Sequence, residues 1–359
     1  MAVIWIYLVH SREWAEFVLA WSRTLGDIHM RKSKTTFIGT SFIALALVAL
    51  SILGMMSKPS VSAAAATRTG YFTGTGLTLP PTRIYFLTTD NMLYLLVPGT
   101  NIYVSLGTVR NIQGNLIGID FRPANGKLYG ETDTGKLYTI NVGSTPPSAS
   151  LVSSLTTPFD GGFQSLFDFN PVVDAIRLIG SNDQNYAIAK DANGNLNTTA
   201  VQTALTYATG DVNAGRNPEV VGGSYTNNLN GATVTLFYAI DHARDTFVTI
   251  ADKNATGSSN TGGGRLQTIG KLVDGGGNRL NFNSVADIDI YTSLAGVNTL
   301  VGINNKTLFT IDLKQINPTL RLGTTQNVGV KSANLTAVPN LDSAIDIAIV
   351  PASSQTASR

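Results

Sequence analysis

Short apolar runs separated by turn-forming residues fill the chain from residue 83 onwards. The runs are rich in Ile, Leu, Val, Tyr and Phe, and Gly, Asn, Asp or Pro stands between them. Runs of this length and composition predict β-strands joined by tight turns. The sequence Asp-Ala-Asn-Gly at 191–194 is a strong hairpin signal of this kind. The pattern therefore predicts an all-β domain.

The runs also recur as groups of four, with a period of roughly 40 to 60 residues that is typical of propellers and solenoids. Four complete groups open with the runs at 116–123, 166–171, 220–225 and 286–290. The last strand of the second group is expected at 201–207, and that of the fourth group at 319–323. Four groups of four strands are thus accounted for.

The two ends of the repeat region predict a closed ring. Residues 83–109 supply only three strands, and the missing opening strand returns near the C-terminus at 344–351. Closing the ring with that strand removes a sheet edge that would otherwise be open to aggregation. We therefore expect a β-propeller of five four-stranded blades. A six-bladed ring and a pair of β-sandwiches with similar strand spacing stay open as alternatives.

A leader precedes this domain. Residues 31–34 are mostly basic, residues 37–54 form an apolar run, and a small-residue stretch ends at Ala66. These are the three parts of a secretory signal peptide, which we expect at 30–66. An uncleaved anchor is the alternative, because about 18 apolar residues can just span a bilayer. Cleavage predicts a secreted or extracytoplasmic protein, in the periplasm or at the cell exterior, with no membrane association afterwards.

The other boundaries follow from the leader and the repeat. We expect an overcalled N-terminal extension at 1–29, a linker at 67–82, the propeller domain at 83–351 and a polar tail at 352–359.

Composition and charge exclude several functional classes. Residues 1–66 hold six of the 25 basic and three of the 23 acidic side chains, which leaves 19 basic and 20 acidic side chains beyond the leader. A near-neutral domain without a basic stripe is not expected to bind nucleic acid. The absence of cysteine excludes disulfides and thiolate chemistry, and His242 is the only histidine after the leader. We expect a monomer.

Four motifs within the repeat resemble a known family. They are Gly-Ile-Asp-Phe-Arg-Pro at 118–123, Phe-Asp-Phe-Asn-Pro at 167–171, Tyr-Ala-Thr-Gly-Asp-Val-Asn-Ala-Gly at 207–215 and Val-Val-Gly-Gly-Ser-Tyr-Thr-Asn at 220–227. In this order they resemble the bacterial secreted family called domain of unknown function 4394, over roughly residues 83–350. The resemblance implies a bacterial origin and a propeller-like fold, but no activity.

An aspartate recurs on the opening strands of the repeat, and it is the candidate metal ligand. The residues are Asp120, Asp168, Asp289 and Asp346. If these strands line the axis of the ring, their carboxylates could converge and bind a hard cation such as Ca²⁺. The alternative is structural, with each acid accepting hydrogen bonds from neighbouring N–H groups. No other cofactor is indicated.

The connection at 207–228 is the candidate ligand site, because long polar links often serve binding. Its candidate residues are Asp211, Asn213, Arg216, Asn217, Tyr225 and Asn227. A guanidinium, amides and tyrosine rings can hold a sugar or a carboxylate. The same groups could instead bond the loop to itself and to the next blade.

Two functions are compatible with these features. The first is a secreted or surface-associated, non-catalytic binding or scaffold propeller, whose partner would be an envelope glycan or a protein. The alternative is a secreted glycoside hydrolase or other carbohydrate-active enzyme, which would need two positioned carboxylates. Glu131 and Glu219 are the only glutamates after the leader. Neither lies in one of the four motifs, so no catalytic residue is assigned and an enzyme is the less favoured function.

Overall fold

The computed structural model describes residues 69–73, 77–97, 99–336 and 343–352. Within these residues the fold is all-β, and the only helices are three 3₁₀ turns of three residues each. No helix in this part of the chain is long and apolar enough to cross a membrane. The signal peptide expected at 30–66, the extension expected at 1–29 and most of the polar tail lie outside the described residues.

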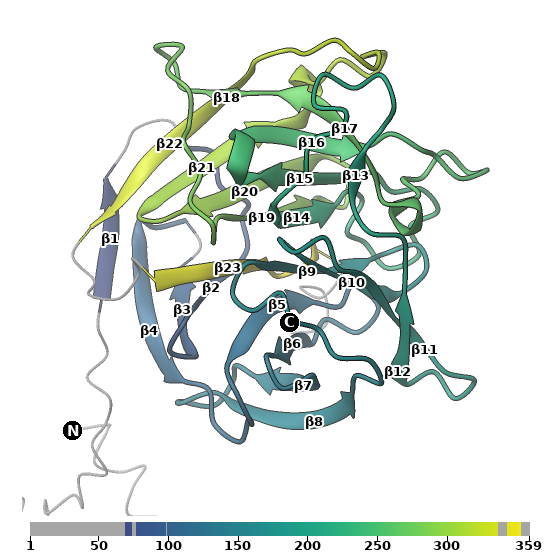
Figure 1. The fold of residues 1–359 in the computed structure, drawn as a ribbon. Coiled ribbons are helices and arrows are strands. Elements are labelled where there is room, and N and C mark those ends of the chain that lie inside the picture. Colours follow the sequence, from purple (N-terminus) through teal and green to yellow (C-terminus); the bar gives the residue numbers. More distant parts are fainter. Residues whose placement is uncertain (1–68, 74–76, 98, 337–342, 353–359) are drawn as a thin grey trace, which may run out of the picture. The chain divides into compact units, whose positions relative to one another are not determined.

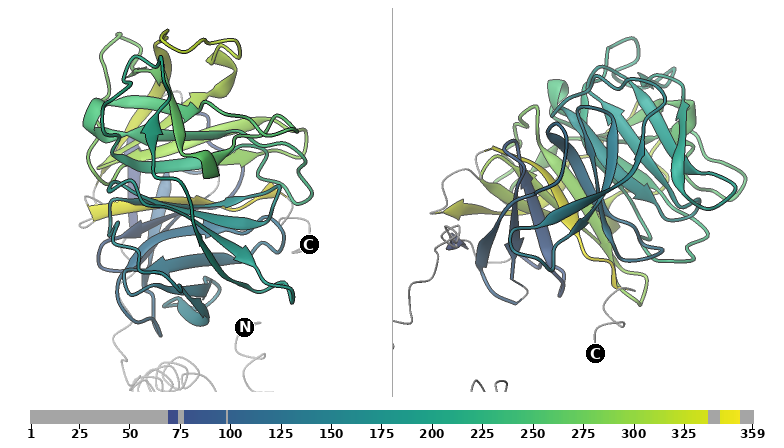
Figure 2. Two further views of the ribbon diagram at one scale, coloured as in Figure 1. Left: turned by 45° about the vertical axis from the view of Figure 1, so that its right-hand side comes forward. Right: turned by 90° about the horizontal axis from the view of Figure 1, so that it is seen from below.

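Five sheets stand around a common axis as the blades of a β-propeller, which confirms the predicted fold class (Figure 1 and Figure 2). The first blade contains β2 (Ile84–Thr88), β3 (Met92–Leu96), β4 (Ile102–Thr108) and β23 (Ala344–Ile349). The second contains β5 (Leu116–Phe121), β6 (Leu128–Thr132), β7 (Lys136–Asn141) and β8 (Ser148–Ser154). The third contains β9 (Ser165–Asn170), β10 (Ala175–Gly180), β11 (Asn185–Lys190) and β12 (Leu196–Val201).

The last two blades each gain a short extra strand. The fourth contains β14 (Val220–Tyr225), β15 (Phe237–Asp241), β16 (Thr246–Ile250) and β17 (Arg265–Gly270), with β13 (Thr206–Tyr207) parallel to β17. The fifth contains β19 (Asp287–Thr292), β20 (Asn298–Asn304), β21 (Thr307–Asp312) and β22 (Val328–Thr336), with β18 (Leu272–Val273) parallel to β22.

Two predicted outer strands were wrong. Residues 201–207 do not end the third blade, because β12 already ends at Val201 and β13 pairs with the fourth blade. Residues 319–323 lie in turns, where the side chain of Asn317 accepts from the N–H of Thr319. The outer strand of the fifth blade is β22, whose Val328 and Val330 are buried. Outer strands are partly exposed, so their local apolar pattern is weak.

The predicted closure of the ring at its inner side is confirmed. Strand β23 pairs antiparallel with β2, with Ile84 opposite Ile349 and Phe86 opposite Ile347. All six residues of β23 are buried. The C-terminal strand thus completes the first blade at the axis.

A second closure was not predicted. Strand β1 (Thr69–Thr73) lies within the segment expected to be a linker, and it pairs with both β22 and β4. It therefore joins the outer edges of the fifth and first blades. The linker assignment of 67–82 is corrected accordingly, because β1 belongs to the propeller.

The core is divided among the contacts between blades. Five buried apolar clusters lie in the described part of the chain, one between each pair of neighbouring blades. Tyr85 and Ile119, for example, pack between the first and second blades, and Leu166 and Phe237 pack between the third and fourth. An innermost strand thus packs apolar side chains on both of its faces, which is why β5 and β14 are buried along their whole length.

Candidate functional site

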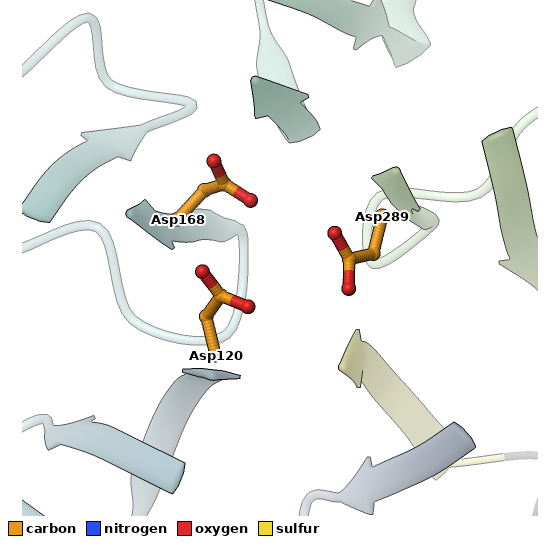
Figure 3. A group of neighbouring side chains, drawn as sticks. All are labelled: Asp120, Asp168 and Asp289. Atoms are coloured by element: carbon orange, nitrogen blue, oxygen red, sulfur yellow. The ribbon is translucent and has the colours of Figure 1, made fainter. Parts of the chain in front are cut away.

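The innermost strands bring three aspartates together at the axis. Asp120 comes from β5, Asp168 from β9 and Asp289 from β19, and each residue is at most 3% exposed. One carboxylate oxygen of each lies within 4.8 Å of one of each of the others. Figure 3 shows the three carboxylates pointing toward one another from separate blades. The sequence prediction named all three.

Each of these acids also bonds to the next blade around the ring. A carboxylate oxygen accepts from a backbone N–H of the neighbouring innermost strand, so the acids connect blades through the backbone. The bonds run from Phe169 N to Asp120 Oδ2 (2.8 Å), from Tyr225 N to Asp168 Oδ1 (3.0 Å) and from Ile349 N to Asp289 Oδ2 (2.6 Å).

The fourth blade has Ser224 at the corresponding place in β14. The hydroxyl oxygen of Ser224 accepts from the N–H of Ile290 at 3.1 Å and lies 3.0 Å from Oδ1 of Asp289, to which it donates. Sequence reasoning missed this residue because serine does not stand out in a search for acids. Its signal is the position one residue before Tyr225, which matches the position of Asp168 before Phe169.

Asp346 occupies a different level of the axis from the other predicted ligands. Its Oδ2 accepts from the N–H of Ile119 at 3.3 Å. In the third and fourth blades the equivalent residue comes directly before the residue whose N–H bonds to the preceding acid. The N–H of Ile349 bonds to Asp289, so the equivalent residue in β23 is Ala348, two positions after Asp346. Asp287 lies on the same level as Asp346. Its Oδ2 accepts at 3.1 Å from the N–H of Ile347, the residue directly after Asp346. The expectation of four equivalent acids is corrected to three, with Asp287 and Asp346 on a second level.

We call Asp120, Asp168, Asp287, Asp289 and Asp346 the axial carboxylates. Burial raises the pKa of each above the ordinary value, and the pKa of Asp289 reaches about 6. For Asp120, Asp168 and Asp346, the negative charge of other axial carboxylates is the next largest cause of the raised pKa. The axis thus gathers acids in surroundings that oppose their ionisation.

The connection at 207–228 is well structured rather than a free loop. Both carboxylate oxygens of Asp211 bond to Thr268, accepting from its N–H and its hydroxyl at 2.7 Å each. The amide of Asn213 donates to the same hydroxyl at 2.9 Å. These two predicted ligand residues therefore fasten the connection to β17.

The remaining predicted ligand residues are spread over different surroundings. Tyr225 is fully buried, and its hydroxyl lies 2.8 Å from Oγ1 of Thr261. Asn217 donates to the carbonyl of Pro218, and Arg216 is exposed. Asn227 alone reaches a surface hollow, described below. The structure thus brings Asp211 and Asn213 together at Thr268 and separates them from Asn227.

The two glutamates considered for catalysis lie in different blades. Glu131, in β6, is 0% exposed, and neither carboxylate oxygen has a hydrogen-bond partner. Burial raises its pKa to about 8. Glu219 precedes β14, and its Oε2 lies 2.9 Å from Nε2 of His242. The burial of Glu131 was not predicted, because Thr132 and Asp133 follow it at the expected end of a strand.

A groove runs across the fourth and fifth blades. Its volume is about 760 Å³, and its floor is apolar, formed by residues such as Leu236, Tyr238, Ile269 and Leu313. Amide and ammonium groups stand among the lining residues, including Asn227, Gln267, Asn298, Lys253 and Lys314. No aspartate or glutamate of the described residues lines this groove.

A second hollow of about 310 Å³ continues the groove. It shares Val297, Asn298 and Lys314 with the groove and adds Lys331 and one acid, Asp312. Lys253 is already engaged, because its Nζ donates to the Ser259 hydroxyl at 3.1 Å. Lys314 and Lys331 are both exposed. The two hollows together offer an apolar floor beside accessible positive charge.

Residues 83–337 match a family model described as "Domain of unknown function (DUF4394)". The match confirms the resemblance that the four motifs indicated. No curated protein matches the chain.

Several solved structures show distant likeness. A structural genomics protein of unknown function from Bacteroides thetaiotaomicron is 9% identical with a TM-score of 0.40, and the match covers 76% of this chain and 71% of that one. The major Malassezia sympodialis allergen Mala s 1 is 9% identical with a TM-score of 0.38, covering 69% and 73%. The RRP9 WD40 repeats are 10% identical with a TM-score of 0.32, covering 58% and 51%. Nothing about function follows from likenesses this distant.

Proposed function

Because the chain belongs to the family of the domain of unknown function DUF4394, whose description assigns no activity, we propose a binding function from the groove and export from the leader. We propose that the protein is an exported, non-catalytic binding propeller, and that the groove across its fourth and fifth blades binds an acidic polysaccharide. The single observation that carries the proposal is the combination of an apolar floor with exposed lysines.

The chemistry of the groove supports a sugar polymer with negative charge. The C–H faces of sugar rings pack on apolar side chains such as Leu236 and Leu313, while amides such as Asn298 bond to hydroxyls. Lys314 and Lys331 attract carboxylates along the chain. A groove that continues from one hollow into the next accommodates an extended polymer better than a compact ligand.

A binding role is favoured over hydrolysis by the placement of the acids. Glycoside hydrolysis needs two carboxyl groups on either side of the scissile bond. Glu131 is buried within the second blade, and Glu219 is beside His242. Neither lines the groove, so no pair of acids supports catalysis there.

Export is part of the proposal and rests on the leader sequence. The three-part signal pattern at 30–66 supports a mature protein that begins between Ala64 and Thr67. Mass spectrometry of protein from the medium or the periplasm tests this. An intact mass that retains residues 37–54 would instead support a membrane anchor.

The binding test uses the purified full-length protein and soluble polymers of different charge. We expect retention on hyaluronan, which carries a uronate in each repeat, and none on neutral dextran. The double variant Lys314→Ala with Lys331→Ala should weaken binding roughly tenfold, which corresponds to about 1.4 kcal/mol. Lys127→Ala is the matched control, because Lys127 is exposed on the second blade.

Three outcomes would contradict the proposal. Equal binding to polyglutamate would point to an acidic peptide partner rather than a glycan. Release of new reducing ends would show hydrolysis. An equal loss of affinity in Lys127→Ala would show that net charge, rather than the groove, governs retention.

A further inference from the structure

The axial carboxylates are buried acids whose strongest charged neighbours are one another. They come from β5, β9, β19 and β23, and the fourth blade contributes the neutral hydroxyl of Ser224. A buried carboxylate is costly unless it is paired or neutralised. A bound cation would remove this cost for several acids at once.

The geometry of three of these acids suits one ion. Oxygens of Asp120, Asp168 and Asp289 lie within 4.8 Å of one another. Ca²⁺ binds oxygen at about 2.3–2.6 Å, so two of its ligands are separated by at most about 4.6–5.2 Å. Mg²⁺ binds at about 2.0–2.1 Å and demands near-ideal octahedral geometry, which a site built from three fixed strands does not readily provide. The three donors are carboxylate oxygens, which favour a hard cation.

Asp346 provides an independent sign of a ligand. It is 1% exposed, and its Oδ1 has no hydrogen-bond partner among the described residues. Its carboxylate lies next to Gly118 of β5, since a Cβ atom added at Gly118 would lie 3.1 Å from Oδ2 of Asp346. Gly118 is two positions before Asp120 and so faces the same side of β5. The carboxylate of Asp346 therefore lies on the side of β5 that also carries the side chain of Asp120, and its Oδ1 is a buried oxygen without a partner.

We propose that the axial carboxylates bind one Ca²⁺ ion, held by Asp120, Asp168 and Asp289 with Asp346 beside them. The three ligands belong to the second, third and fifth blades, so the ion connects separate blades through their innermost strands. Its role is to neutralise the axis and to stabilise the ring. This site is distinct from the groove proposed to bind polysaccharide.

Calcium binding to the full-length protein tests the proposal. The protein is stripped with EDTA and titrated with CaCl₂ by isothermal calorimetry, and its melting is followed in parallel. We expect one equivalent of Ca²⁺ to bind and to raise Tm by on the order of 5 °C at saturation, with Mg²⁺ less effective. Asp168→Asn should weaken binding by roughly tenfold or more, since a charged ligand is lost.

Asp191→Asn is the matched control. Asp191 lies in the β11–β12 turn, whose sequence has a superficial likeness to a calcium loop, and its carboxylate accepts from the N–H groups of Asn193 and Asn195. This variant should keep the wild-type affinity. If it loses calcium binding while Asp168→Asn keeps it, the ion binds at the turn and the proposal fails.

A second measurement covers the case in which Asp168→Asn does not fold. Tb³⁺ luminescence on the wild-type protein should saturate at one equivalent and be displaced by Ca²⁺, and Asp346→Asn should weaken that displacement. Stripped wild-type protein that gives no binding heat, no Tb³⁺ signal and no change in Tm with millimolar CaCl₂ would overturn the proposal.

Discussion

The axis of the propeller and the groove across its fourth and fifth blades differ in both charge and surroundings. The axis collects five buried aspartates from four strands, each bonded to the backbone of the next blade. The groove collects exposed lysines above an apolar floor, with no acid among the described residues that line it. Buried charge bonded across blades affects whether the ring forms, whereas exposed charge affects what the surface attracts. Changes at the axis should therefore alter stability, and changes at the groove should alter binding.

The largest effect is expected from removing the strand that completes the axis. Deleting residues 340–359 removes Ile345, Ile347 and Ile349, each at most 2% exposed. Each contributes about 1.5–3 kcal/mol, against a total stability of about 5–15 kcal/mol. We expect the truncated protein not to fold, as followed by circular dichroism and size-exclusion chromatography. Deleting only residues 353–359 is the control and should be harmless. A truncated protein that stays soluble and melts like wild type would refute the importance of inner closure.

A pH-dependent effect is expected at Glu131, one strand away from the axis. Unlike the axial carboxylates, this buried acid has no hydrogen-bond partner for either oxygen. Burial raises its pKa from 4.5 to about 8. The folded state therefore holds a proton that the unfolded state releases, and the stability of the wild type falls as pH rises from 4.5 toward 8. Each pKa unit corresponds to about 1.4 kcal/mol.

Glu131→Gln removes this titration. Urea unfolding near pH 4.5 should give similar stabilities for the variant and the wild type. Near pH 8 the variant should be more stable than the wild type by several kcal/mol. Glu219→Gln is the matched control, because that side chain is partly exposed beside His242. A stability difference that does not change with pH would show that Glu131 is not protonated in the folded state.

A smaller loss is expected at Gly118, where two blades meet close to the axis. A Cβ atom at this position would lie 2.4 Å from the Cβ of Phe167 in the third blade. Gly118→Ala should therefore cost about 1–3 kcal/mol through overpacking, as measured by urea unfolding. Gly275→Ala is the control, because a methyl group at that position would meet no atom within 4 Å. Equal stabilities for the two variants would show that the blades can separate without cost.

The smallest effect on stability is expected in the groove. Lys314→Ala removes an exposed charge, so the free energy of unfolding should change by less than about 0.5 kcal/mol. The same variant should bind hyaluronan more weakly, as measured by affinity electrophoresis. A large loss of stability would mean that Lys314 belongs to the scaffold, and the contrast between axis and groove would not hold.

The inner strands of the blades, their grouping and the inner closure of the ring could be predicted from the amino-acid sequence, whereas two outer strands and β1 could not. Alternating apolar residues bounded by turn residues defined the blades, and the incomplete first group pointed to the C-terminal strand that completes it. The recurrence of aspartate on the opening strands predicted four acids at the axis, and three of them, Asp120, Asp168 and Asp289, come together there. These features were accessible because a strand, a hairpin turn and a repeat each leave a local pattern in the chain.

How the strands meet across blades depends on the tertiary structure. Only the packed structure shows that Asp346 lies on a second level of the axis and that Ser224 occupies in the fourth blade the place of the acids in the other blades. It also shows that Tyr225 is buried in the core. Packing also made β1 part of the ring and formed a groove from residues of two blades. The register between neighbouring innermost strands is set by side-chain packing between the blades, and no pattern within one strand encodes it.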